Sequence, residues 1–202
     1  CATAGEGHAE TPHDAGPDAA PAGSPAGPTW RWLRAPTGRA LQQNAGAAAA
    51  DGEWLWFVHA DATLAAATLP ALARFIAAGA PALGYFDLRF LDDGPALTRV
   101  NAVGAWLRSR WLRLPFGDQG LLLPRAAFVS LGGFDPATAR GEDHQLVWRA
   151  RRTGLAIKPV GAPIYTSARR YAAQGWATTT GGHLLETWRQ ARRFARADGP
   201  PG

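Results

Sequence analysis

Several residue types are nearly missing from this chain of 202 residues. Its only cysteine is Cys1, which excludes an intrachain disulfide and any metal site built from cysteines. Methionine is absent, which predicts that the natural start lies upstream. No uninterrupted apolar run is long enough to span a bilayer, and no charged-then-apolar signal peptide is visible.

Lysine occurs only at position 158, so arginine carries almost all of the positive charge behind the net +5. The planar guanidinium group, with its fixed fork of donors, is well suited to phosphate and carboxylate. An excess of this size fits an anionic small substrate, a membrane surface or nucleic acid equally well. Composition alone therefore leaves three classes of partner open.

Residues 1–29 contain no Val, Ile, Leu, Phe, Tyr or Trp. Such a segment cannot bury enough apolar surface to offset the entropy lost on ordering, so we expect it to be disordered. Aromatic and aliphatic residues begin at Trp30. We predict one folded domain over 30–198, followed by a flexible tail over 199–202.

Hydrophobic patterning within the domain predicts strands that alternate with helices. The predicted strands cover 30–33, 53–58, 83–91, 121–123 and 156–160. The predicted helices cover 39–50, 69–78, 96–114, 142–152 and 184–197. This alternation indicates an α/β sandwich with a mostly parallel central sheet.

The stretch from Glu53 to Thr63 is the one around which the domain is organised. Its apolar run is short and aromatic, as in a buried strand, and stops at His59 and Asp61. Residues two apart in an extended chain face the same side, so these two side chains can share one cleft. Open α/β sheets place ligands at such carboxyl ends. The alternative is a strand that runs out into a polar loop, with Asp61 capping the next helix.

Four other clusters carry groups suited to chemistry, and each also has a structural interpretation. Gly38 and Arg39 open a helix that contains Asn44, an arrangement that suits a phosphate but also follows many ordinary turns. Asp118 and Gln119 lie in a glycine-flanked turn. The two remaining clusters are Glu142 with Asp143, which begin a helix, and Arg169 with Arg170, which follow a strand.

The acidic pair is the most informative of these clusters. The helix dipole favours ionised carboxylates in the first turn, and an ionised carboxylate is what a general base needs near neutral pH. Capping of the helix explains one acid more naturally than both. For the arginine pair, a solvated surface position is the common alternative.

Taken in order, the clusters resemble the family 2 glycosyltransferases of the GT-A fold, in the bacterial branch related to arsenosugar-biosynthesis-type enzymes. The resemblance covers about residues 30–188 and rests on five motifs together. The matching segments are Gly-Arg-Ala-Leu-Gln-Gln-Asn-Ala-Gly-Ala at 38–47, His-Ala-Asp at 59–61, Gly-Asp-Gln-Gly at 117–120, Leu-Gly-Gly-Phe-Asp at 131–135 with Gly-Glu-Asp at 141–143, and Ser-Ala-Arg-Arg at 167–170.

This resemblance implies transfer of a sugar from a nucleotide-diphosphate donor to an acceptor hydroxyl, with inversion at the anomeric carbon. It implies that Asp61, with His59 in the first position of an Asp-x-Asp-type motif, holds Mg²⁺ or Mn²⁺ against the diphosphate. Asp143 matches the base, and Glu142 would orient it or the acceptor. The remaining implied contacts are Arg39 and Asn44 beside the nucleotide, Asp118 and Gln119 near the donor sugar, and Arg169 and Arg170 on the acceptor or phosphate side.

The chain departs from this family at its start. Family members open with an apolar strand that binds the nucleobase, and residues 1–29 contain none, so we expect the opening to be lost or replaced. A non-catalytic GT-A remnant that binds sugar or a partner is therefore the alternative function. A nucleic-acid binder is disfavoured, because the arginines are spread over several elements and no nucleic-acid module is recognisable.

Two predicted helices combine tryptophan with arginine. In 96–114 the apolar stripe is Leu97, Val100, Gly104, Leu107 and Trp111, and in 184–197 arginines lie opposite Leu184 and Trp188. Such helices either lie in a lipid headgroup layer or pack on their own domain, and the second is commoner. The expected location is cytoplasmic, with peripheral contact at the inner face of the membrane as the further hypothesis.

Overall fold

The computed structural model describes residues 31–138 and 140–196. The segment predicted to be disordered (1–29) and the predicted tail (199–202) lie outside these residues. Trp32 ends an N-terminal unit, and all elements described below belong to the unit that begins at Leu33.

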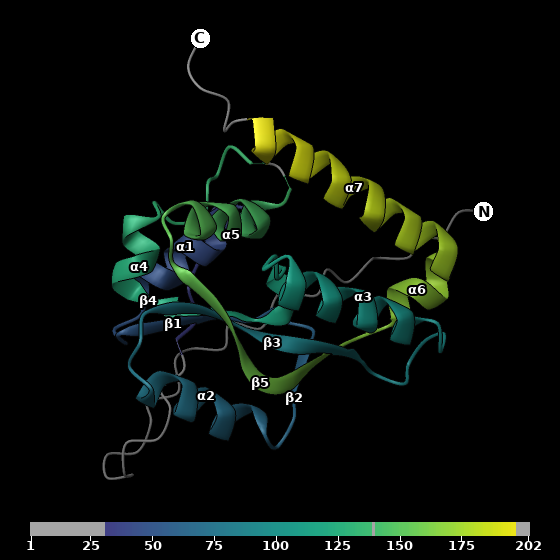
Figure 1. Ribbon diagram of the computed structural model, residues 1–202, viewed down its shortest axis with the longest axis horizontal. Helices are drawn as coiled ribbons and strands as arrows, with labels where there is room; N and C mark the ends of the chain where they lie inside the picture. Colours follow the sequence, from purple (N-terminus) through teal and green to yellow (C-terminus); the bar gives the residue numbers. More distant parts are fainter. Residues whose placement is uncertain (1–30, 139, 197–202) are drawn as a thin grey trace, which may run out of the picture. The chain divides into compact units, whose positions relative to one another are not determined.

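Figure 1 shows how the helices and strands of this unit are arranged. The helices are α1 (Arg39–Ala49), α2 (Thr68–Ala77), α3 (Thr98–Trp111), α4 (Arg125–Ser130), α5 (Glu142–Arg152), α6 (Arg169–Gln174) and α7 (Trp176–Arg196). The strands are β1 (Trp54–Phe57), β2 (Ala62–Leu64), β3 (Ala82–Phe90), β4 (Leu121–Pro124) and β5 (Ala156–Thr166), and a 3₁₀ turn, η1, covers Gly117–Gln119.

Most predicted elements are confirmed, although their ends shift by a few residues. Residues 31–33 form no strand, and the final helix begins at Trp176 instead of position 184. The strand predicted at 156–160 continues to Thr166. It contains Pro159 and Pro163, and its register with β3 shifts there, which accommodates residues that normally interrupt a strand.

The five strands form one mixed sheet in the order β1-β4-β3-β5-β2. β3 and β5 pair in parallel, whereas the pairs β1/β4, β3/β4 and β2/β5 are antiparallel. The prediction of a mostly parallel sheet is therefore wrong. The chain leaving α3 turns back beneath that helix through η1, so β4 starts beside the middle of β3 and runs against it, with Leu122 opposite Gly84.

Apolar side chains cover both faces of the sheet, which explains why β3 is buried along most of its length. Leu83 and Tyr85 pack into a core formed with α1, α4 and α5. Phe86 points to the other face, where α2 supplies Ala71. Figure 1 shows α2 on one side of the sheet and α3, α5 and α7 on the other.

Helix α3 packs on the sheet through its small and polar residues. Its buried positions are Thr98, Ala102, Ala105 and Ser109. The apolar stripe predicted for this helix, from Leu97 through Val100 to Trp111, points to solvent in the described part of the chain. α3 therefore lies on the domain with the opposite face from the one an amphipathic helix ordinarily buries.

Candidate functional site

Arg39 joins two motifs that are far apart in the sequence. It is the first residue of α1, where the positive φ of Gly38 lets the chain turn sharply into the helix. Its Nη2 donates to His59 Nε2 at 3.0 Å, at the end of β1. Its Nε lies 3.1 Å from Oε1 of Glu142, an ion pair without the alignment of a hydrogen bond. The Arg39 side chain is about half exposed to solvent, whereas the Glu142 side chain is buried.

Asp143 is held by the glycine turn that precedes β4. The Gly117 N–H donates to Asp143 Oδ2 at 2.6 Å. A Cβ at position 117 would lie 2.6 Å from the same oxygen, so glycine is required for the carboxylate to come this close. The motif at 117–120 and the acidic start of α5 are therefore in direct contact.

Arg108 lies next to this unit, although it was not among the predicted site residues. Its guanidinium stacks 3.4 Å from the centroid of the Phe116 ring. Burial lowers the pKa of Arg108, while the nearby Asp118 and Asp143 carboxylates act to raise it. The charge of this partly buried guanidinium therefore partly offsets the negative charge of the two carboxylates.

His144, the next residue of α5, is also part of the surroundings. Its ring makes an edge contact with Phe116 at 4.5 Å between centroids. Nδ1 and the Gln190 side-chain oxygen, which comes from α7, are 2.9 Å apart. Burial lowers the pKa of His144, partly offset by this hydrogen bond and by the neighbouring Asp143. The ring therefore links the first turn of α5 to α7.

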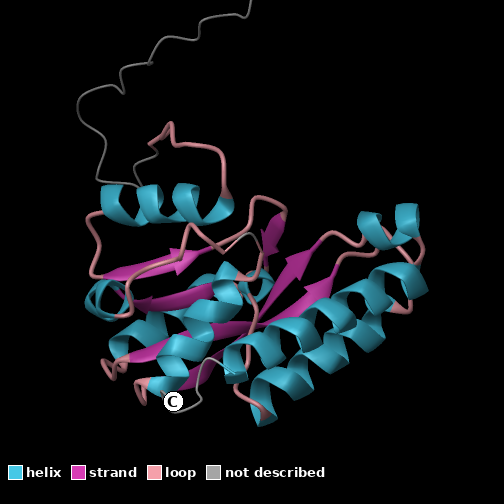
Figure 2. Ribbon diagram, turned by 90° about the horizontal axis from the view of Figure 1, so that it is seen from above, coloured by secondary structure: helices cyan, strands magenta, loops and turns pink. Residues whose placement is uncertain are grey.

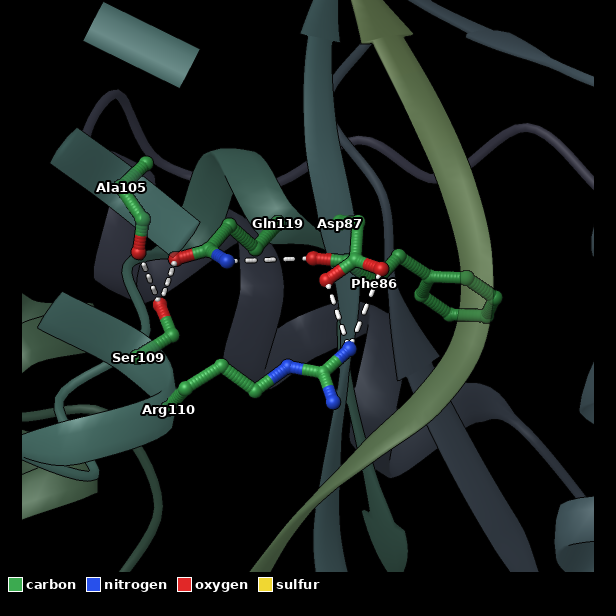
Figure 3. A network of polar contacts seen from close by, with 6 residues as sticks. All are labelled: Phe86, Asp87, Ala105, Ser109, Arg110 and Gln119. Atoms are coloured by element: carbon green, nitrogen blue, oxygen red, sulfur yellow. Dashed lines mark hydrogen bonds and ion pairs between the residues drawn. The ribbon is translucent and has the colours of Figure 1, made fainter. Parts of the chain in front are cut away.

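Two predicted ligand-binding residues are used within the protein. Asn44 exchanges a pair of hydrogen bonds with the Phe134 backbone, at 2.7 Å to the carbonyl and 3.0 Å from the N–H. The Gln119 side chain is completely buried and binds four groups. Its Oε1 accepts from Arg108 and from the Phe116 N–H. The same oxygen accepts from Ser109, and Nε2 donates to the Phe86 carbonyl, as Figure 3 shows. Both residues place backbone around the site and are committed to that role.

Asp61 is exposed in the turn immediately before β2, where the Thr166 hydroxyl donates to Oδ2 at 3.4 Å. Mg²⁺ is commonly held by one or two carboxylates together with substrate phosphates, and Asp61 fits that role. His59 does not fit in this arrangement, because its Nε2 lone pair already accepts from Arg39. Among residues 31–138 and 140–196, no three His, Cys, Asp or Glu side chains gather into a metal-binding group.

Arg169 and Arg170 start α6 at a different place on the sheet. Arg169 Nε donates to Ser167 Oγ at 2.9 Å and lies 3.8 Å from an Asp93 oxygen. Hydrogen bonds from Ser167 and from the Ala168 N–H hold the pKa of Asp93 below its ordinary value. Arg170 bonds to Gln174 within α6.

An electrostatic interaction relates Tyr171 of α6 to the glycine turn at 117–120. The pKa of Tyr171 is raised, chiefly by burial and additionally by the charge on Asp118. Asp118 therefore lies within electrostatic reach of both Tyr171 and Arg108.

Two surface pockets lie beside this region, between β3 and α3. One, of about 210 Å³, is lined by Arg89, Asp92, Arg99 and Tyr165, among others. The other, of about 190 Å³, includes Asp87 and Trp106. None of the predicted site residues lines either pocket.

The structure thus brings together Arg39, His59 and Glu142, and separately Gly117 and Asp143, with Glu142 and Asp143 adjacent in the chain. Arg108 and His144 were missed because their types and positions match no motif. The sequence spacing of Arg108 and Phe116 does not predict their contact, because the contact depends on how the chain turns back after α3.

Comparisons with known proteins add no assignment. No protein-family model matches the chain, and no curated protein matches it in sequence.

Proposed function

We propose that the protein is a family 2 glycosyltransferase that moves a sugar from a nucleotide-diphosphate donor to an acceptor hydroxyl, with inversion. The observation that carries the proposal is the meeting of motifs. The starts of α1 and α5, the end of β1 and the turn before β4 are spread between Arg39 and Asp143, and three side-chain contacts join them. Ordinary turns and caps have no need to converge in this way.

The proposal includes the finer fold assignment, a GT-A sandwich. Support comes from the α/β architecture and from the position of Asp61 shortly after the apolar strand β1, which lies at one edge of the sheet. The sheet that carries these elements is mixed, with a single parallel pairing among the described strands.

In the proposed reaction Asp143 takes the proton of the acceptor hydroxyl. The hydroxyl oxygen forms a bond to the anomeric carbon while the bond from that carbon to the donor diphosphate breaks, and the diphosphate leaves with the electron pair. The Gly117 N–H fixes one oxygen of the Asp143 carboxylate and so orients the other. A positioned base of this kind contributes about 10²–10⁴-fold to rate.

Positive charge for the leaving diphosphate comes from the start of α1. Backbone N–H groups at a helix start favour anions, and the Arg39 guanidinium lies beside them. Asp61 would hold Mg²⁺ or Mn²⁺, which neutralises charge on the leaving group when bound. Glu142 keeps Arg39 directed toward the end of β1, so it acts as a positioning residue.

The experiment that tests this function uses the full chain and a panel of nucleotide-diphosphate sugars, with release of nucleoside diphosphate as the readout. Asp143→Asn should lower turnover by about 10²–10⁴-fold while donor binding, measured by calorimetry, stays within a factor of two or three. Asp51→Asn, which alters an exposed carboxylate in the loop after α1, is the matched control and should retain activity. Wild-type turnover by the Asp143 variant would refute the assignment.

A second experiment addresses the cation. Donor binding should strengthen on adding Mn²⁺, and Asp61→Asn should remove that increase without lowering the melting temperature, because the side chain is exposed. An Asp61 variant that binds donor and Mn²⁺ like the wild type would remove this residue from the site.

The alternative is a GT-A remnant that binds sugar or a partner without transfer. His59, which stands where many relatives have Asp, favours this alternative. Donor binding without release of nucleoside diphosphate, across the whole panel and with either cation, would select it over the enzyme.

A further inference from the structure

The outer face of α3 is apolar and points away from the domain. Leu97, Val100, Val103, Leu107 and Trp111 lie on this face, and Trp111 is 76% exposed. The buried face of the same helix consists of Thr98, Ala102, Ala105 and Ser109. Because the helix already makes its contacts with the sheet through small residues, the apolar face is available for another surface.

Helix α7 adds to this face. α3 and α7 lie side by side in both views (Figures 1 and 2). The Asn101 side chain of α3 joins them: it accepts a hydrogen bond from the Trp176 indole and donates one to the Thr180 hydroxyl. Leu184, Leu185 and Trp188 on α7 are each about half exposed or more. Isolated exposed apolar residues are common, but two neighbouring helices that both expose leucine and tryptophan are not.

Arginine surrounds these apolar residues. Arg99 and Arg113, at the two ends of α3, and Arg189 and Arg192 on α7 are exposed. Arg192 stacks over the Trp188 ring at 4.5 Å. The segment 98–111 contains no Asp or Glu, and 176–196 contains one, Glu186. Arginine with tryptophan on an exposed apolar face is the composition of helices that lie in a lipid headgroup layer.

We propose that the α3–α7 face docks on an anionic lipid bilayer surface. The tryptophans and leucines enter the boundary between headgroups and acyl chains, and the four exposed arginines contact lipid phosphates. The contact is peripheral: none of the described helices is both long and apolar enough to cross a bilayer. The docking surface is separate from the residues assigned to glycosyl transfer, so it stands or falls independently of that activity.

Charge favours lipid over a second copy of this chain. A twofold dimer through this face would place the same patch of each copy against the other, arginine against arginine. An anionic bilayer instead supplies the opposite charge over the whole face.

The test is co-sedimentation of the full chain with vesicles. Vesicles of phosphatidylcholine with one third phosphatidylglycerol should pellet the protein at low salt, and high salt should release it. Pure phosphatidylcholine should bind at least tenfold more weakly.

Variants locate the surface. Trp111→Ala and Trp188→Ala should each weaken partitioning on the order of tenfold, because a large aromatic group is no longer buried in the lipid. Arg113→Gln and Arg189→Gln should each weaken it about fivefold. The matched controls lie on α2, on the other side of the sheet: Leu69→Ala and Arg74→Gln, both at exposed positions, should bind like the wild type.

Three results would overturn the proposal. The first is no sedimentation with anionic vesicles at low salt. The second is binding that the α2 variants weaken as much as the α3 and α7 variants do. The third is concentration-dependent self-association, measured by ultracentrifugation, that Trp111→Ala abolishes while vesicle binding is absent; this would assign the face to a second copy.

Discussion

Helices α5 and α3 lie on the same side of the sheet, yet they make contact with the domain in different ways (Figure 1). α5 buries the completely inaccessible Leu146, Val147 and Ala150, and Arg151 and Arg152 at its C-terminal end are exposed. α3 buries alanine, serine and threonine and exposes valine, leucine and tryptophan. Helix α5 is therefore held by the burial of large apolar side chains, and α3 by close packing of small side chains.

The polar contacts of α3 explain how close approach suffices. Ser109 donates to the Ala105 carbonyl and also to the buried Gln119 side chain, at 2.7 and 2.8 Å (Figure 3). Arg110 reaches across to Asp87 of β3. Small side chains let the helix come close enough for the Ser109 hydroxyl to reach both of these partners. Large apolar residues are then not needed between helix and sheet.

The largest expected effect is in the apolar contact of α5. Leu146→Ala should lower the free energy of unfolding by about 2–5 kcal/mol, because it removes a fully buried side chain and leaves a cavity. Urea denaturation measures this change. Leu69→Ala, at an exposed position of α2, is the control and should change stability by less than about 0.5 kcal/mol. Equal losses in the two variants would contradict the burial of α5.

Overpacking should affect α3. Ala105→Leu adds three carbons where the helix meets its neighbours, and should lower the free energy of unfolding by about 1–3 kcal/mol. The same denaturation experiment applies. Val103→Leu, on the exposed face of the same helix, should be nearly neutral. A neutral Ala105→Leu would show that α3 is not closely packed.

Acid should weaken the α5 side through His144. Its folded-state pKa lies below the ordinary value near 6.5, chiefly because the ring is buried. In the unfolded chain His144 therefore binds a proton more readily than in the folded chain, and the free energy of unfolding falls as the pH decreases below about 6.5. The slope for one proton approaches about 1.4 kcal/mol per pH unit.

Denaturation at several pH values between 8 and 5 would check this dependence. Replacing the ring by His144→Gln should flatten it over the same range, whatever the effect on stability at pH 8. An unchanged slope in that variant would assign the acid sensitivity to another group.

The smallest effect is expected on the outer face of α3. Trp111→Ala should change the free energy of unfolding by less than about 0.5 kcal/mol, because the side chain is mostly exposed. Thermal denaturation in the absence of lipid is the measurement. A loss comparable with that of Leu146→Ala would mean that the apolar face of α3 is part of the core.

Much of the fold was predictable because apolar periodicity is a local property. The helices at Arg39–Ala49 and Glu142–Arg152 and the strands at Trp54–Phe57 and Ala82–Phe90 lie close to their predicted bounds. Strand direction was not predictable in this way. It depends on where the chain turns back after α3, and that turn is held by contacts of Gln119 with β3, which no local pattern contains.

The orientation of α3 was also beyond a pattern-based argument. An apolar stripe identifies a helix, but it identifies the buried face only if burial of apolar residues decides the packing. In α3 the small residues at Ala102, Ala105 and Ser109 decide it instead.

The candidate site was predictable as a set of segments more than as a set of roles. The starts of α1 and α5, the end of β1 and the turn at 117–120 do meet. The side-chain amides of Asn44 and Gln119, however, form hydrogen bonds with backbone and buried groups of the protein itself. Motif residues of a polar type can carry a site by shaping its backbone, and sequence alone does not separate that use from ligand contact.

The buried Gln119 amide has a consequence for how the domain opens. The side-chain oxygen accepts from the Phe116 N–H and from Arg108 and Ser109 of α3, and the nitrogen donates to the Phe86 carbonyl of β3. The turn therefore cannot expose the Phe116 N–H to water without also breaking hydrogen bonds to α3 or to β3. Hydrogen exchange at this loop amide should therefore be as slow as in its regular neighbours, and should occur in the same cooperative opening as β3.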